Sequence, residues 1–266
     1  MNSPLTFIWE KGDDPMYMRL FQMKIKPEQL PAYRQFYDET VIPEFQKMEG
    51  CLYATLIQSG HQEDECISMT LWDTPAHAKA CEQSRVFEKL LQEEKQYLAD
   101  SSEWKVQLSK ELKLEYTPVP EEPIVKAFNV AAGTDEKIPA HETGPMYLRI
   151  VSLRIQPGKI EEFRRIYTDE IIPVLRSVKG CRYAYATESA KEKNDVISVT
   201  IWDSKQDAEN YETSGVFAQL VEKAKDTFSD LYQWKMGLQK EFGGKVATSE
   251  DLKVEHYSIV TGKRFQ

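Results

Sequence analysis

Two polar residue types occur at equivalent places 130 residues apart in this sequence, and both could bind an oxygen-bearing ligand. Arg19 and Arg149 stand near the start of alternating, strand-like segments. A guanidinium is a planar, charged donor that suits a carboxylate or an oxyanion. Ser68 and Ser198 could each hydrogen-bond a substrate hydroxyl or carbonyl. The alternative for the arginines is a salt bridge at the rim of a sheet, and for the serines a locally paired hydroxyl.

Aromatic residues recur at the same spacing. Trp72 and Trp202 could form a large, rigid and mostly apolar wall on which a flat aromatic molecule stacks. They could equally fill the core between helices and a sheet. Tyr53 and Tyr183 could present a phenolic hydroxyl to a cleft, or they could pack in the core with that hydroxyl satisfied.

The residues two positions after the arginines differ between the two places. Phe21 follows Arg19, whereas Val151 follows Arg149. Because alternate residues of a strand share a face, each is expected to lie beside its arginine in a cleft. The difference in side-chain volume predicts two clefts of unequal size, at most one of which is catalytically competent.

The cysteines and histidines are not spaced like the ligands of a dedicated metal site. The four cysteines show no C-x-x-C spacing, and the four histidines show no H-x-x-x-H spacing. His77 falls in the first turn of an expected helix and is interpreted as an exposed residue. We expect no metal site, and we expect reduced, mostly buried thiols at Cys51, Cys66, Cys81 and Cys181.

Charge and hydropathy exclude several classes of partner. The formal net charge is −9 and no Lys/Arg-rich run is present, so nucleic acid is not an expected partner. No stretch of eighteen apolar residues occurs, and the N-terminus lacks the features of a signal peptide. We therefore expect no membrane association and a cytoplasmic location.

An internal duplication supplies the elements that position these residues. The sequence from Pro15 aligns with the sequence from Pro145, without a gap as far as Lys110 and Lys240. The stretch between the copies is rich in proline and then polar, so it is expected to cross the outer surface as a linker. The predicted division is an N-terminal segment 1–14, a first domain 15–117, a linker 118–144 and a second domain 145–262.

Both copies show the same order of expected elements. Residues 17–25 alternate like a strand, and apolar residues from Glu28 onward keep helical spacing that Pro43 interrupts. Further strands are expected at residues 51–59, 66–72 and 104–116, with a helical region that begins after Thr74. The order β-α-β-β-α-β is that of the ferredoxin-like fold.

The third strand of each copy has one apolar and one mixed face. A ferredoxin-like unit leaves one face of its sheet uncovered, and the second copy can cover it. We therefore expect one α+β barrel closed through the apolar faces, with a cleft between the mixed faces and the helices. Such a chain is compact as a monomer, and further pairing of identical chains remains open. The residues of the apolar faces are Ile67, Met69, Leu71, Ile197, Val199 and Ile201.

Several short motifs recur in this order in both copies: Lys-Pro or Gln-Pro after the first strand, a late proline in the helix, Gly-Cys-x-Tyr, Trp-Asp, and Ser-x-Val-Phe. This order resembles the antibiotic biosynthesis monooxygenase (ABM) domain. The resemblance implies two ferredoxin-like domains in tandem that form an intramolecular dimeric α+β barrel. It also implies that Trp72 and Trp202 line the pocket between helices and sheet.

The resemblance is less specific for the reaction. The haem-degrading members carry a His and an Asn at positions that here correspond to Leu91 or Val221 and to the first strands. The phenol-oxidising members carry an Asn four residues before the Trp, where Ser68 and Ser198 stand.

Three functional hypotheses follow from the resemblance. The first is a monooxygenase that acts on a small aromatic, quinol-like molecule without metal or flavin, the substrate itself reducing dioxygen. The second is a non-catalytic ligand-binding or structural barrel that has lost the catalytic residues. The third is a haem-binding or haem-degrading protein whose ligand would come from His77 or a methionine.

Overall fold

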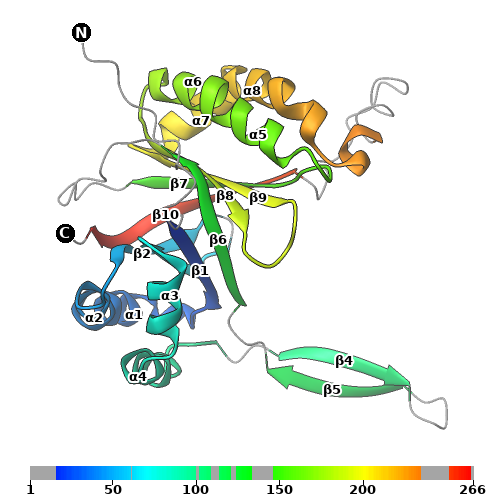
Figure 1. Cartoon of the computed structure of the whole chain (residues 1–266). Coiled ribbons are helices and arrows are strands. Elements are labelled where there is room, and N and C mark those ends of the chain that lie inside the picture. Colours follow the sequence, from blue (N-terminus) through cyan, green and yellow to red (C-terminus); the bar gives the residue numbers. More distant parts are fainter. Residues whose placement is uncertain are drawn as a thin grey trace.

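A closed barrel of eight strands forms the centre of the computed structural model, which describes residues 16–60, 62–99, 102–108, 114–120, 124–133, 146–234 and 252–264. Its strands are β1 (Tyr17–Lys24), β2 (Cys51–Ser59), β3 (Glu65–Trp72), β6 (Ile124–Gly133), β7 (Tyr147–Arg154), β8 (Cys181–Ser189), β9 (Asp195–Trp202) and β10 (Leu252–Arg264). Around the barrel their order is β1-β3-β2-β10-β7-β9-β8-β6 (Figure 1).

Each copy of the repeat contributes four neighbouring strands. The first copy forms β6-β1-β3-β2 and the second forms β10-β7-β9-β8, which is the ferredoxin-like order in both cases. The two central pairs have the same antiparallel register, Tyr17 lying opposite Trp72 and Tyr147 opposite Trp202. The sheets join where β2 pairs with β10 and where β6 pairs with β8. The predicted α+β barrel of two ferredoxin-like units within one chain is confirmed.

The fourth strand of the first copy lies later in the chain than the sequence suggested. Residues 104–116 were expected to form it, but β4 (Ser102–Leu108) and β5 (Leu114–Pro120) pair with each other in a hairpin that extends away from the barrel (Figure 1). Strand β6 takes the place beside β1 instead.

The prediction that residues 118–144 only cross the outer surface is therefore wrong for Ile124–Gly133, which pairs on both sides within the barrel. The prolines of this stretch predict the start of a linker. Pro118 and Pro120 lie instead in β5, which pairs with a single neighbour, and an edge strand tolerates residues without an N–H. Residues 134–145 lie outside the described part of the chain.

Helices cover the outer face of each sheet, those of the two copies on opposite sides of the barrel (Figure 1). Those of the first copy are η1 (Pro27–Gln29), α1 (Leu30–Phe36), η2 (Tyr37–Val41), α2 (Ile42–Gln46), α3 (Pro75–Glu82) and α4 (Arg85–Glu94). Those of the second are α5 (Ile160–Ile166), η3 (Tyr167–Ile171), α6 (Ile172–Ser177), α7 (Lys205–Thr213), α8 (Val216–Ala224) and η4 (Lys225–Thr227). No helix in these described ranges is long and apolar enough to cross a membrane.

Proline changes the first long helix of each copy without ending it. Just before Pro43 the chain forms the π-helical turn η2, in which the Ile42 N–H donates to the Tyr37 carbonyl five residues back. The second copy repeats this before Pro173, where the Ile172 N–H donates to the Tyr167 carbonyl. A proline cannot donate an i→i−4 bond, and the wider turn accommodates the missing donor. As a result Tyr37 and Tyr167 both face the sheet and are buried.

The barrel interior is one apolar cluster built from both copies. It contains the predicted apolar faces of the third strands together with side chains from β1, β2, β7, β8 and β10. Separate clusters lie between each sheet and its own helices. The prediction that the copies close through their apolar faces is confirmed, and the mixed faces lie under the helices as expected.

Candidate functional site

Each copy encloses a cavity between its helices and the mixed face of its sheet. The first cavity has a volume of about 30 Å³, and its wall includes Arg19, Phe21, Tyr37, Ser68, Thr70 and Glu94. The second has about 50 Å³, and its wall includes Arg149, Val151, Tyr167, Ser198, Thr200 and Ala224. These are equivalent positions of the repeat, so one ancestral cavity has diverged into two.

The two arginines are buried at the cavity walls and not exposed at a rim. Arg19 is 4% exposed, and its Nε lies 3.1 Å from Oε1 of Glu82, an ion pair that lacks the alignment of a hydrogen bond. The guanidinium carbon lies 4.5 Å from the centre of the Phe87 ring. Burial lowers the pKa of Arg19, while the charge of Glu82 opposes that effect.

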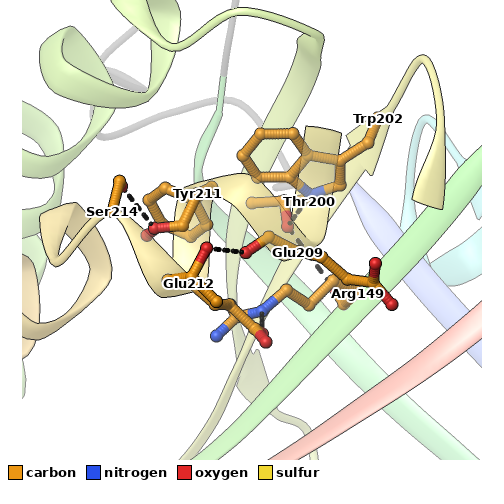
Figure 2. Close-up of polar contacts among 8 residues, drawn as sticks. Arg149, Thr200, Trp202, Glu209, Tyr211, Glu212 and Ser214 are labelled. Carbon is orange, nitrogen blue, oxygen red and sulfur yellow. Dashed lines mark hydrogen bonds and ion pairs between the residues drawn. The ribbon is translucent and has the colours of Figure 1, made fainter. Parts of the chain in front are cut away.

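Arg149 is likewise buried, paired with a glutamate and close to an aromatic ring, but among the described residues its donor without a partner is Nη2 and not Nε. Its Nε donates to Oε1 of Glu212 at 2.5 Å (Figure 2). Its guanidinium carbon lies 4.1 Å from the centre of the Phe217 ring. The side chain is 2% exposed, and its Nη2 has no hydrogen-bond partner among the described residues. The predicted face shared by Arg149 and Val151 is confirmed, as is that shared by Arg19 and Phe21.

The two serines are hydrogen-bonded to tyrosines of the π-helical turns. Ser68 Oγ lies 2.7 Å from Tyr37 Oη, and Ser198 Oγ lies 2.8 Å from Tyr167 Oη. Burial raises the pKa of both phenols well above the ordinary value, so both tyrosines remain neutral. Each pair places hydroxyl groups at the wall of its cavity.

Glu94 gives the first cavity a carboxyl group, whereas none is found among the described residues that line the second. Its side chain comes from the last residue of α4, it is 8% exposed, and its Oε1 accepts a hydrogen bond from Tyr33 Oη. Burial raises the pKa of Glu94 to about 7, although the Tyr33 hydrogen bond and the Arg19 charge both favour the ionised form. The equivalent residues in the second copy are Ala224 and Phe163.

Sequence reasoning missed Glu94 and Tyr33. The signal that could have found them is a difference between the copies, because a core-facing helical position that is alanine in one copy is a carboxylate in the other. A charged side chain rarely replaces alanine in a core without a partner or a role.

The profile of the antibiotic biosynthesis monooxygenase family matches residues 16–93 and 146–223. The chain belongs to this family. The matched segments run from β1 and β7 to the next-to-last residues of α4 and α8, so Glu94 and Ala224 lie one residue beyond them. The comparison with curated proteins finds no match.

Several solved structures share this fold over almost the whole chain. A putative monooxygenase from Fusobacterium nucleatum subsp. nucleatum superimposes with a TM-score of 0.66 at 9% identity, over 94% of this chain and 95% of that one. A putative monooxygenase from Lactobacillus acidophilus gives 0.63 at 7% identity, over 94% and 97%. An anthrone oxidase-like protein gives 0.57 at 13% identity, over 95% and 94%. At these identities the likeness concerns the fold alone.

The two ABM tryptophans lie beside the cavities and not on their walls. Trp72 and Trp202 are fully buried, and each donates its indole N–H to the threonine two residues earlier, at 2.9 Å to Thr70 and 2.8 Å to Thr200. Figure 2 shows the second of these pairs. The threonines line the cavities, so the tryptophans reach them only indirectly. Trp72 packs against Phe45 of α2 and Trp202 against Tyr211 of α7, so both belong to the helix–sheet cores.

Tyr53 and Tyr183 also lie outside the cavities. Both belong to the cluster inside the barrel. A bulge shifts the register of each second strand between the cysteine and the tyrosine, so that Tyr53 pairs with Leu71 and not with Thr70. Because one extra residue reverses which face a side chain takes, the tyrosines turn away from the helices.

The histidine and cysteine side chains were the remaining candidates for metal or redox chemistry. In the described ranges no three potential ligands gather as they would around a metal ion. His77 Nδ1 lies 2.7 Å from Asp73 at the helix start and is partly exposed. The four cysteines form no disulfide, and burial raises the pKa of Cys66 to about 12 and that of Cys81 to about 11. Leu91 and Val221 line the cavities with apolar groups.

Proposed function

We propose that this ABM protein is a monooxygenase that oxidises a phenolic, quinol-like aromatic molecule in the first cavity. The observation that carries the proposal is the buried carboxyl of Glu94, which shares the wall of this cavity with the buried cation of Arg19. A base and a cation at one small cavity suit the removal of a proton from a phenol and the stabilisation of the resulting anion.

The first step is the transfer of a phenolic proton to the Glu94 carboxylate. A phenol has a pKa of about 10, so transfer to a carboxylate of pKa about 7 is unfavourable by about 4 kcal/mol before other groups contribute. The charge of Arg19 stabilises the phenolate and reduces this cost. Tyr33 holds the Glu94 carboxylate by its hydrogen bond and thereby acts as a positioning residue.

The electrons for the oxidation come from the substrate. The phenolate gives two electrons to dioxygen, a C–O bond forms at the ring, and the peroxide anion takes the proton back from Glu94 to become a hydroperoxide. Its O–O bond then breaks, and water leaves with one oxygen atom and two hydrogens. A quinol plus dioxygen thus gives a hydroxyquinone plus water, in which one atom of dioxygen remains on the ring.

The cavity must widen before such a molecule binds. A volume of about 30 Å³ holds about two water molecules, which is far less than an aromatic ring needs. Helix α4 supplies Phe87, Leu90 and Leu91 to the wall. Substrate binding therefore requires an outward movement of α4, and return of the helix would exclude water from the phenolate.

The test is oxygen uptake with 1,4-dihydroxynaphthalene and with anthrone, after subtraction of the rate without protein. We expect Glu94→Gln to lower kcat by about 100-fold or more, because general bases contribute about 10²–10⁴-fold. The matched control is Glu93→Gln, which neutralises a neighbouring α4 glutamate that pairs with Lys89 at the surface. With ¹⁸O₂, the product is expected to carry one labelled atom.

Two results would contradict the proposal. Equal rates in the wild type and Glu94→Gln would remove Glu94 from the chemistry. No uptake above background with either compound, together with measurable binding of both, would favour the non-catalytic ligand-binding barrel.

A further inference from the structure

We propose that the second cavity is a binding site for a planar aromatic carboxylate, held by Arg149 and not turned over. This inference does not depend on the function proposed for the first cavity, because it rests on different residues and is tested by binding alone.

The first observation is an unsatisfied buried donor. Arg149 is 2% exposed, and its Nε is used by Glu212, while its Nη2 has no hydrogen-bond partner among the described residues. An unpaired donor of a buried cation costs free energy, and such groups are uncommon in native proteins. A carboxylate oxygen at this wall would accept the free N–H and satisfy it.

The second observation is what the cavity does not contain. Its wall, as far as the described residues show, carries no carboxyl group, because Ala224 stands where the first copy has Glu94. The Glu212 carboxylate pairs with Arg149 but is not part of the wall, and it is 26% exposed toward solvent. An anion is therefore not opposed by a charge inside the cavity, and a bound phenol would find no base.

The remaining wall suits an aromatic ring. The centre of the Phe217 ring lies 4.1 Å from the Arg149 guanidinium carbon. The centre of the Tyr211 ring, which Figure 2 shows, lies 5.5 Å from it. Val151 replaces the Phe21 of the first copy, and the cavity is larger, at about 50 Å³ against about 30 Å³. Because this is still less than a benzene-sized ligand occupies, binding requires α8, which carries Phe217 and Leu220, to move outward.

The experiment is isothermal titration of the full chain with 2-naphthoate at pH 8, with 2-naphthamide as a neutral probe of the same shape. At this pH Glu94, whose pKa is about 7, is ionised, so the first cavity disfavours an anion. We expect one naphthoate per chain and at least tenfold weaker binding of the amide. Arg149→Met should weaken naphthoate binding at least tenfold, whereas Arg19→Met, its counterpart in the first copy, should change it less than twofold.

Two further variants guard against a folding defect in Arg149→Met. Val151→Phe installs the residue of the first copy and fills the free volume while the buried charge stays paired, and Ala224→Glu installs the carboxyl of the first copy. Both should weaken naphthoate binding at least tenfold, and circular dichroism should show both to be folded. Equal binding of acid and amide, or equal losses from Arg19→Met and Arg149→Met, would overturn the proposal, as would tight binding to Val151→Phe.

Discussion

The groups around the Glu94 carboxyl raise its pKa well above that of an ordinary glutamate. Burial favours the neutral acid, whereas the Tyr33 hydroxyl and the Arg19 cation favour the carboxylate, and the pKa settles at about 7. Arg19 also forms an ion pair with Glu82 of α3, and the negative charge of Glu82 partly cancels the effect of Arg19 on the pKa of Glu94. A base that ionises near neutral pH suits proton abstraction at that pH.

The pH dependence of turnover follows from this balance. Because Glu94 acts as a base only when ionised, kcat/KM, which reports the free enzyme, should rise with pH through a midpoint near 7. Tyr33→Phe, which gives the first copy the residue of the second, removes a hydrogen bond that lowers the pKa, so the midpoint should move to higher pH. Oxygen-uptake rates between pH 5 and 9 measure both midpoints. A profile that Tyr33→Phe leaves unchanged would exclude control by this pair.

At the scale of elements, positive-φ glycines set the turn between each helix pair and the second strand. Gly50 has a φ of 76°, and a Cβ added there would lie 2.2 Å from side-chain atoms of both Asp73 and His77. Gly180 repeats this against Asp207. The left-handed conformation alone costs a non-glycine residue about 1–2 kcal/mol. The clash of an added Cβ with these neighbouring side chains would increase that cost.

A pair of substitutions separates the two costs. Gly50→Ala should lower the free energy of unfolding by about 2–4 kcal/mol, from backbone strain plus the displacement of Asp73 and His77. Gly158→Ala is the matched control, because its φ is 83° and nothing lies within 4 Å of its added Cβ. It should cost only about 1–2 kcal/mol. Urea denaturation of both variants gives the comparison, and equal losses would mean that the contact with Asp73 and His77 is not restrictive.

Much of the element order was predictable because periodicity and turn residues report local structure directly. The alternation in β3 and β9 correctly separated barrel-facing Ile67 from cavity-facing Ser68, since a strand without a bulge keeps its period of two. For Tyr53 the pattern left cleft and core both open, and the bulge after Cys51, which has no mark in the sequence pattern, places this side chain in the core. The same reasoning failed for β6, because which alternating segment pairs with β1 depends on long-range partners.

The whole molecule differs from a dimer of single-domain ABM chains in that its halves are free to diverge. The residues identical in the two copies include Trp72 and Trp202, which belong to the helix–sheet cores, whereas the proposed chemistry lies at Glu94, where the copies differ. A symmetric pair of chains must keep the same residues in both cavities. Here Glu94 and Ala224 occupy equivalent places, so one barrel offers two different sites.

Divergence of the cavities does not make the halves independent in stability. Leu20 of β1 is 3% exposed and packs in the barrel cluster with residues of both copies. Leu20→Ala should lower the free energy of unfolding by about 2–5 kcal/mol, the usual cost of such a cavity. Since the strands of both copies share this cluster and pair at β2–β10 and β6–β8, the loss should appear throughout the barrel.

Native-state hydrogen exchange tests this expectation segment by segment. Amides of β9, which lies in the second copy, should lose as much protection in Leu20→Ala as amides of β3, because both exchange through the same global opening. Phe163→Ala is the comparison: it empties space in the second helix–sheet cluster and should also lower protection in β3. If each substitution affected only the strands of its own copy, the barrel would open as two separate units, and the shared interior would not couple them.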